Sequence, residues 1–199
     1  MNDAANDRTG KIIGMWLFLY SEIILFGGLF VLYAVYFNKY TADFVEGGMK
    51  LDRIIGTANT IILLASSFTV ACSITAVRRQ QVKAAVSFLL FSIICGAVFL
   101  VNKYFEWGHK FHDGIYPNSE ILTGGAPGIN IFFGMYYTIT GLHGIHIVLG
   151  MILLCVSLGM ILSGKITGDN TVVLENSGLY WHLVDLIWIF VFPLFYLVL

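Results

Sequence analysis

Residues 136–150 of the 199-residue chain read YYTITGLHGIHIVLG, and they lie inside an apolar run that extends from about residue 129 to residue 163. Two histidines, His143 and His146, fall near the middle of this run. One helical face holds four of its residues, at the spacing i, i+4, i+7 and i+11: Ile139, His143, His146 and Gly150. A polar face in the middle of a membrane helix must point into protein, because lipid offers no hydrogen-bond partners. The stretch therefore predicts a central membrane helix against which other helices pack.

The composition indicates an integral membrane protein. The chain is 58% hydrophobic and 12% charged, with a mean hydropathy of +0.82, whereas soluble domains are about half apolar and about a quarter charged. The formal net charge is −1 and no basic patch is present, so we expect no nucleic-acid partner. The three cysteines stand singly in apolar runs, which argues against a zinc site or a disulfide framework: Cys72, Cys95 and Cys155.

Five runs are long enough to cross about 30 Å of hydrocarbon, which takes about 20 apolar residues. They cover approximately residues 11–37, 54–77, 82–104, 129–163 and 178–199. None shows the period-2 alternation of a barrel strand. We therefore predict an all-α fold of five transmembrane helices in a single membrane domain, residues 1–199, joined by loops.

The orientation prediction depends on one short basic turn, RRQQVK at residues 78–83, which makes the second and third helices an antiparallel hairpin. Placing its cations in the cytoplasm puts the N-terminus inside and the C-terminus outside. Residues 1–11 are polar and lack the features of a signal peptide, so we expect the first apolar run to remain as a membrane span.

Glu22 lies about ten residues into the first predicted span, hence about 15 Å deep at 1.5 Å per residue. An ionised side chain at that depth costs about 2.5–3.5 kcal/mol on insertion scales. Glu22 is therefore expected to be protonated, paired inside the bundle or hydrated. A neutral acid bonded to a neighbouring helix and a functional carboxylate both fit.

Other polar residues lie on the remaining helices. Asn59 and Thr60 on the second span are typical of close helix packing. Glu106 falls just past the predicted end of the third span, where an interfacial loop is favoured over metal binding, because no second Glu-x-x-His unit is visible.

The last span begins LYWHLVDLIWIF, with Trp181, Asp185 and Trp188 on one face and His182 one turn before the aspartate. An interfacial tryptophan belt explains this pattern. A His–Asp pair that binds another helix or a partner chain explains it as well.

Haem ligation by two histidines would need one histidine on each of two facing helices at matching depth. His143 and His146 lie on one helix in mid-membrane, whereas His182 lies near a helix start, so the depths match poorly. A stand-alone haem b carrier and a small transporter remain as competing interpretations. The sequence lacks the inverted repeat and the broken helices that are typical of transporters, which argues against the second of these.

Four segments in order resemble subunit III of the haem–copper terminal oxidases, and the resemblance covers essentially the whole chain. They read GMWLFLYSEIILF (residues 14–26), ANTIILLAS (58–66), TGLHGIHIVLG (140–150) and YWHLVDLIW (180–188).

The resemblance implies an accessory subunit of an oxidoreductase complex, a proton-translocating cytochrome c oxidase of the aerobic respiratory chain in the bacterial plasma membrane. No catalytic centre, haem or metal is expected in this chain. Haem and copper belong to partner subunits, and structural phospholipid is expected. Subunit I would be the main contact, with subunit II and a small subunit IV as further partners.

Glu22 matches the buried glutamate of the family's SE motif, which implies a role in proton or oxygen access. Glu106 also matches a family glutamate. The other signature positions are expected to hold the bundle together: His143, His146, Trp181, His182 and Asp185. The chain begins at what resembles the third helix of seven-helix members, as five-helix bacterial forms do. The SE motif and the ANT stretch favour cytochrome c as the electron donor, and a quinol oxidase is the alternative.

Overall fold

The computed structural model describes residues 2–168 and 170–198, and side chains from residue 9 onward. The regular structure of the described residues consists of helices and one isolated bridge between Thr167 and Asn170. In chain order the helices are α1 (Asn2–Lys39), α2 (Thr41–Met49), α3 (Arg53–Arg78), α4 (Val82–His112), α5 (Glu120–Thr123), α6 (Pro127–Leu162) and α7 (Val172–Tyr196).

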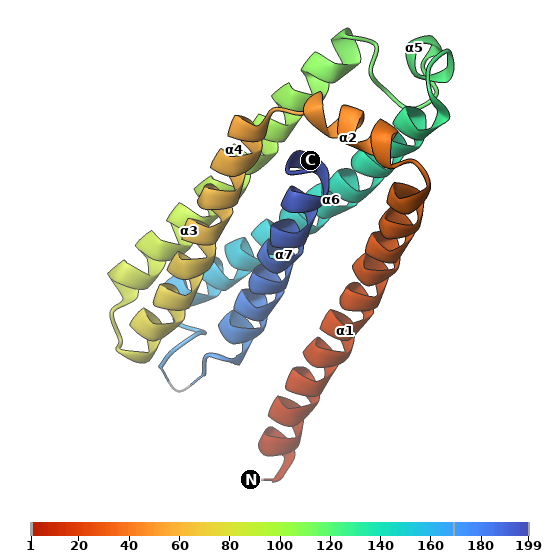
Figure 1. Ribbon diagram of the computed structural model, residues 1–199. Helices are drawn as coiled ribbons and strands as arrows, with labels where there is room; N and C mark the ends of the chain where they lie inside the picture. The colour runs from red at the N-terminus through yellow and green to blue at the C-terminus, as the bar shows by residue number, and fades with distance from the viewer. Residues whose placement is uncertain (1, 169, 199) are drawn as a thin grey trace.

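Five of these helices, α1, α3, α4, α6 and α7, are long and apolar enough to cross a membrane. This confirms the predicted all-α fold and its five spans. Figure 1 shows α3 and α4 as the antiparallel hairpin that the short basic turn predicted.

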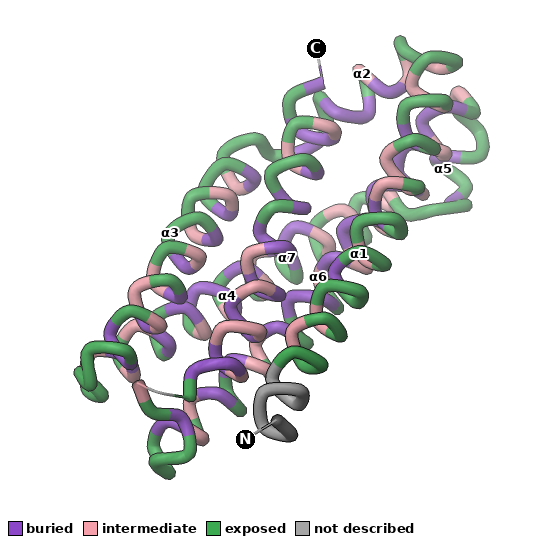
Figure 2. Tube along the Cα trace, turned by 90° about the horizontal axis from the view of Figure 1, so that it is seen from below, coloured by how far each residue is buried: buried purple, intermediate pink, exposed green. Residues whose placement is uncertain are grey.

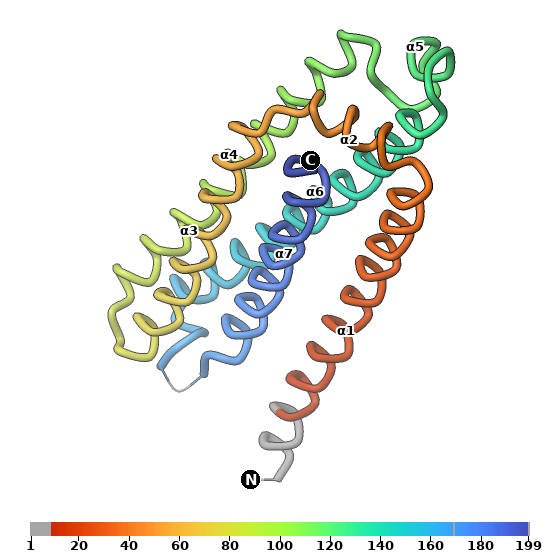
Figure 3. The backbone as a smooth tube through the Cα atoms, in the orientation of Figure 1, coloured from red at the N-terminus to blue at the C-terminus, as the bar shows by residue number. Residues whose placement is uncertain are grey.

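The N-terminus, the α3–α4 turn and the connection between α6 and α7 lie at one end of the bundle, whereas α2, α5 and the C-terminus lie at the other (Figures 1 and 3). The predicted topology also places these two groups of segments on opposite sides of the membrane. Which end faces the cytoplasm stays a prediction.

Several helices extend beyond the predicted spans: α1 begins at Asn2 rather than residue 11, and α7 begins at Val172 rather than residue 178. The third span was expected to end at residue 104, but α4 continues to His112 and carries Glu106 inside the helix rather than in an interfacial loop. The helix can continue because Lys103 pairs with Glu106 one turn later, so neither charge needs water. The expected loop at residues 38–53 contains α2, whose Phe44 and two glycines are buried.

The last helix lies at the centre of the bundle, while the first lies at its side. Within an apolar 18-residue stretch of each helix, 56% of the residues are buried in α7 but 11% in α1. Figure 2 shows the contrast, with long exposed stretches along α1. Helix α7 packs closely on α3 and α6 through small residues; a Cβ on Gly178 would lie 3.1 Å from the Ile74 side chain on α3.

Candidate functional site

Glu22 on α1 and His146 on α6 form a pair inside the bundle. Oε2 of Glu22 lies 2.8 Å from Nε2 of His146, and the two side chains are 12% and 9% exposed. The other ring nitrogen, Nδ1, lies 2.7 Å from the carbonyl oxygen of Leu142 in the preceding turn. The structure thus gives Glu22 a partner on a neighbouring helix.

The contact with Leu142 determines how protons are placed in this pair. A carbonyl oxygen only accepts, so Nδ1 of His146 must carry a hydrogen. A single further proton then lies between Nε2 of His146 and Oε2 of Glu22, on the carboxyl group or on the imidazole. Either placement leaves the pair with no net charge, which suits its position in the membrane.

An apolar groove of about 240 Å³ lies beside this pair, between α1 and α7. Its walls are side chains such as Ile23, Phe30 and Phe190, together with Phe26, whose ring meets the His146 ring edge-on at 5.2 Å between centroids. The proton-sharing pair is therefore next to space that opens on the outside of the bundle.

A second polar cluster lies near the other end of α4. Nζ of Lys103 lies 3.0 Å from Oε2 of Glu106, 3.0 Å from the hydroxyl of Tyr136 and 2.8 Å from that of Tyr196. Both tyrosine hydroxyls donate to Oε1 of Glu106 at 2.7 Å. The ammonium group also lies over the ring of Trp188, 5.5 Å from its centroid. Every ionised group in the cluster has charge-assisted partners.

Sequence reasoning did not identify Lys103 as a member of a buried polar cluster. The Lys-x-x-Glu spacing of Lys103 and Glu106 is a signal that could have found the ion pair, because residues three apart share a helical face. The two tyrosines, which lie 33 and 93 residues after Lys103, gave no such signal.

The tryptophans of α7 join helices rather than line the membrane surface. Trp181 and Trp188 are fully buried. Nε1 of Trp181 donates to Ser66 at 2.9 Å, and Nε1 of Trp188 donates to Thr60 at 3.1 Å, both on α3.

The predicted His–Asp pair does not form directly. Nδ1 of His182 lies 2.6 Å from the hydroxyl of Ser67 on α3, so His182 does bind another helix. Asp185 is 3% exposed, and neither of its carboxylate oxygens has a hydrogen-bond partner among the described residues.

Asn59 and His143 also lie in the core. Oδ1 of Asn59 accepts from Asn102 on α4 at 2.8 Å. His143 is fully buried between the rings of Phe99 and Trp188, at 5.5 and 5.1 Å between centroids, and its ring nitrogens have no partner in the described part of the chain.

The histidines are thus distributed among separate environments: His146 faces α1, His143 lies among aromatic rings and His182 faces α3. Within the described residues, no group of three or more His, Cys, Asp or Glu side chains is placed to hold a metal ion. The chemistry that this arrangement supports is proton sharing in buried pairs.

Comparison with known proteins identifies the family of the chain. The family model described as cytochrome c oxidase subunit III matches residues 3–198. Subunit 3 of the cytochrome bo(3) ubiquinol oxidase of Buchnera aphidicola is 30% identical over 200 residues, covering 98% of this chain and 92% of the relative. Cytochrome c oxidase subunit 3 of Thermostichus vulcanus is 29% identical over 192 residues, covering 94% and 87%.

A third relative, from Aeropyrum pernix, is named heme-copper oxidase subunit I+III. It is 32% identical over 192 residues, which cover 92% of this chain but 22% of that longer protein. With a match over nearly its whole length and the five-span fold expected of it, the chain belongs to the cytochrome c oxidase subunit III family.

Proposed function

We propose that this chain is the non-catalytic accessory subunit III of a haem–copper respiratory oxidase in a bacterial plasma membrane. The observation that carries the proposal is the family match over residues 3–198. In this role the chain supports the assembly and stability of a complex that reduces oxygen and pumps protons. Haem and copper are held by partner subunits, and structural phospholipid binds at the surface.

Subunit I is the proposed main partner, with subunit II and a small subunit IV completing the complex. The fused subunit I+III relative supports the contact with subunit I, since one polypeptide there carries both names. The sparse burial of α1 supports a further contact on that side of the bundle, because its apolar face is left open.

Cytochrome c is the proposed electron donor. The SE motif around Glu22 and the ANT stretch at residues 58–60 support this choice. A quinol oxidase is the second candidate, and relatives of both kinds support keeping it.

Purification of a tagged copy of the chain in mild detergent tests the assignment, with an untagged strain as the control. Mass identification is expected to find a large haem-bearing subunit I and a copper-binding subunit II, and the donor site of subunit II would then distinguish cytochrome c from quinol. A colourless chain without partners would contradict the proposal and favour a transporter. A coloured chain without partners would identify a haem carrier.

The Glu22–His146 pair is the proposed functional feature of this subunit. It holds one exchangeable proton beside an apolar groove, which supports a role in proton or oxygen access near the partner subunit.

A further inference from the structure

Asp185 is a buried acid that the proposed function leaves unused. It lies thirteen residues into α7, hence about 20 Å along a helix of about 37 Å, which places it near the middle of the membrane. Its side chain is buried, and neither of its oxygens has a hydrogen-bond partner among the described residues. A carboxyl group that only held the bundle together would have such partners, because an unpaired buried charge opposes folding. An un-ionised carboxylic acid fits this position, and packing alone does not explain it.

Ser67 on α3 connects this acid to the edge of the bundle. Its hydroxyl lies 2.6 Å from Nδ1 of His182, and it also faces the Asp185 carboxyl group, just beyond hydrogen-bond geometry. A small rotation of either side chain closes that gap. His182 is half-buried, and its Nε2 is neither enclosed nor bonded to another described residue, so this nitrogen is accessible from outside the bundle.

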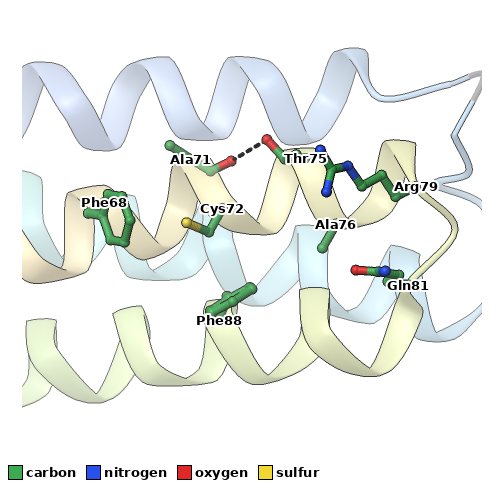
Figure 4. A pocket seen from close by; sticks show the side chains of 8 residues that line it. All are labelled: Phe68, Ala71, Cys72, Thr75, Ala76, Arg79, Gln81 and Phe88. Carbon is green, nitrogen blue, oxygen red and sulfur yellow. Dashed lines mark hydrogen bonds between the residues drawn. The ribbon is translucent and has the colours of Figure 1, made fainter.

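The opposite side of α3 leads away from this cluster. Phe68, the neighbour of Ser67, lines a groove of about 380 Å³ on the outside of the α3–α4 hairpin, and Arg79 lines the same groove near the turn (Figure 4). Ser67 is not part of that lining, and its hydroxyl contacts α7 instead. The path from Asp185 to the surface therefore runs through the seam between α3 and α7.

The groups around Asp185 leave it without a counter-ion. From α4, the thiol of Cys95 lies close enough to sense a charge on the acid. From α3 the acid meets Ser67, and His182 is one turn earlier on its own helix. In the described part of the chain, neither α4 nor α6 places a cation against it. His182, reached through Ser67, is thus the base available to accept its proton.

We propose that Asp185, Ser67 and His182 form a proton relay, in which the proton rests on Asp185 and His182 is the entrance. In the resting state the O–H of Asp185 donates to Oγ of Ser67, the O–H of Ser67 donates to Nδ1 of His182, and the imidazole keeps its hydrogen on Nε2. This order of donors leaves every member neutral, which suits the middle of a membrane.

Transfer along the relay moves two protons by one step each. The O–H bond of Asp185 breaks as a new one forms on Ser67, and the original O–H bond of Ser67 breaks as an N–H bond forms on Nδ1 of His182. The products are a carboxylate and an imidazolium, so the net charge is unchanged. The imidazolium can then exchange its Nε2 hydrogen with water that reaches the surface of the bundle. The relay shares no residue with the Glu22–His146 pair and does not depend on the role proposed for that pair.

Infrared spectroscopy of the purified complex tests the resting state. An un-ionised carboxylic acid has a carbonyl stretching band that a carboxylate lacks. Asp185→Asn should remove one such band. Glu22→Gln is the matched control, because it changes a carboxyl group elsewhere in the bundle and should leave the Asp185 band in place. If Asp185→Asn removes no acid band, the carboxyl group is ionised and the proposal is wrong.

Transfer of the complex to D2O tests the connection through Ser67, because exchange of the acid proton shifts the Asp185 band. Ser67→Ala should raise the frequency of this band and slow its exchange by about tenfold or more, since the acid loses its hydrogen-bond acceptor and the proton loses its path. Ser67→Thr keeps a hydroxyl group and should restore much of the exchange. Ser73→Ala is the control, as this buried serine of α3 bonds only within its own helix.

These serine variants retain the carboxyl group, so they test the relay even where Asp185→Asn fails to assemble. Equal exchange rates in Ser67→Ala and Ser73→Ala would overturn the proposal.

His182→Asn separates the entrance from packing. The asparagine amide can still accept from Ser67 but takes up no proton, so the Asp185 band should keep its position while its exchange becomes as slow as in Ser67→Ala. An exchange rate equal to that of the unchanged protein would show that the proton reaches Asp185 by another route, which contradicts the relay.

Discussion

Gly150 on α6 lies directly against the indole ring of Trp181 on α7: a Cβ at this glycine would be 2.7 Å from Cε3 of the tryptophan. The same ring meets α4, where a Cβ on Gly96 would lie 2.8 Å from Cη2. Trp181 is fully buried and its Nε1 is bonded to Ser66, so the ring cannot move away easily. One side chain of α7 therefore sets the approach of α3, α4 and α6.

Gly150→Ala should destabilise the protein by about 1–3 kcal/mol, because the added methyl group overpacks a fully buried ring. Gly159→Ala is the matched control on the same helix, with no atom within 4 Å of its Cβ. It should be neutral or stabilising by up to about 1 kcal/mol, since alanine reduces the freedom of the unfolded chain. Equilibrium unfolding in detergent measures both, and equal effects would contradict the packing argument.

Lys103→Met should cost about 3–5 kcal/mol in the free energy of unfolding, because it leaves the Glu106 carboxylate buried without its cation. The double variant Lys103→Met with Glu106→Leu should recover much of this loss. Lys50→Met breaks an ion pair with Glu46 whose side chains are 38% and 57% exposed, and it should cost less than about 1 kcal/mol. If Lys103→Met lowered the free energy of unfolding as little as Lys50→Met does, water would have to reach the cluster.

Glu22→Leu should cost about 1–3 kcal/mol, because Nε2 of His146 would be left buried without a partner. Glu22→Gln should cost less than about 1 kcal/mol, since the amide can donate to the same nitrogen. Thermal unfolding of the purified complex tests this order. Equal instability of the two variants would mean that an amide at position 22 does not replace the carboxyl group in its contact with His146, which contradicts this prediction.

Glu22→Gln should also shorten the time that the oxidase remains active during turnover, while leaving assembly intact. The amide keeps the contact with His146 but cannot release a proton, so this variant separates proton exchange from packing. The number of turnovers before inactivation is the measurement, and Glu46→Gln on the exposed face of α2 is the control. An unchanged lifetime would refute the functional role of the Glu22 carboxyl.

The tight α3–α4 hairpin and the five spans were predictable from the sequence, because the length and hydropathy of a helix that crosses a membrane are local properties. The end of α4 was not, because it depends on tertiary contacts. Hydropathy falls at Lys103 and Glu106, yet the helix continues since Tyr136 and Tyr196 complete their hydrogen bonds from other helices.

By itself, the sequence placed Glu22 within a membrane helix, where it must be protonated, paired or hydrated because lipid supplies no partner. Only the tertiary structure decided that the partner is His146, 124 residues away, and that Leu142 orients its imidazole. It also decided that Arg78 binds Glu175 while the adjacent Arg79 faces a groove. Residue spacing defines a helical face, but the neighbour of that face depends on how all the helices pack.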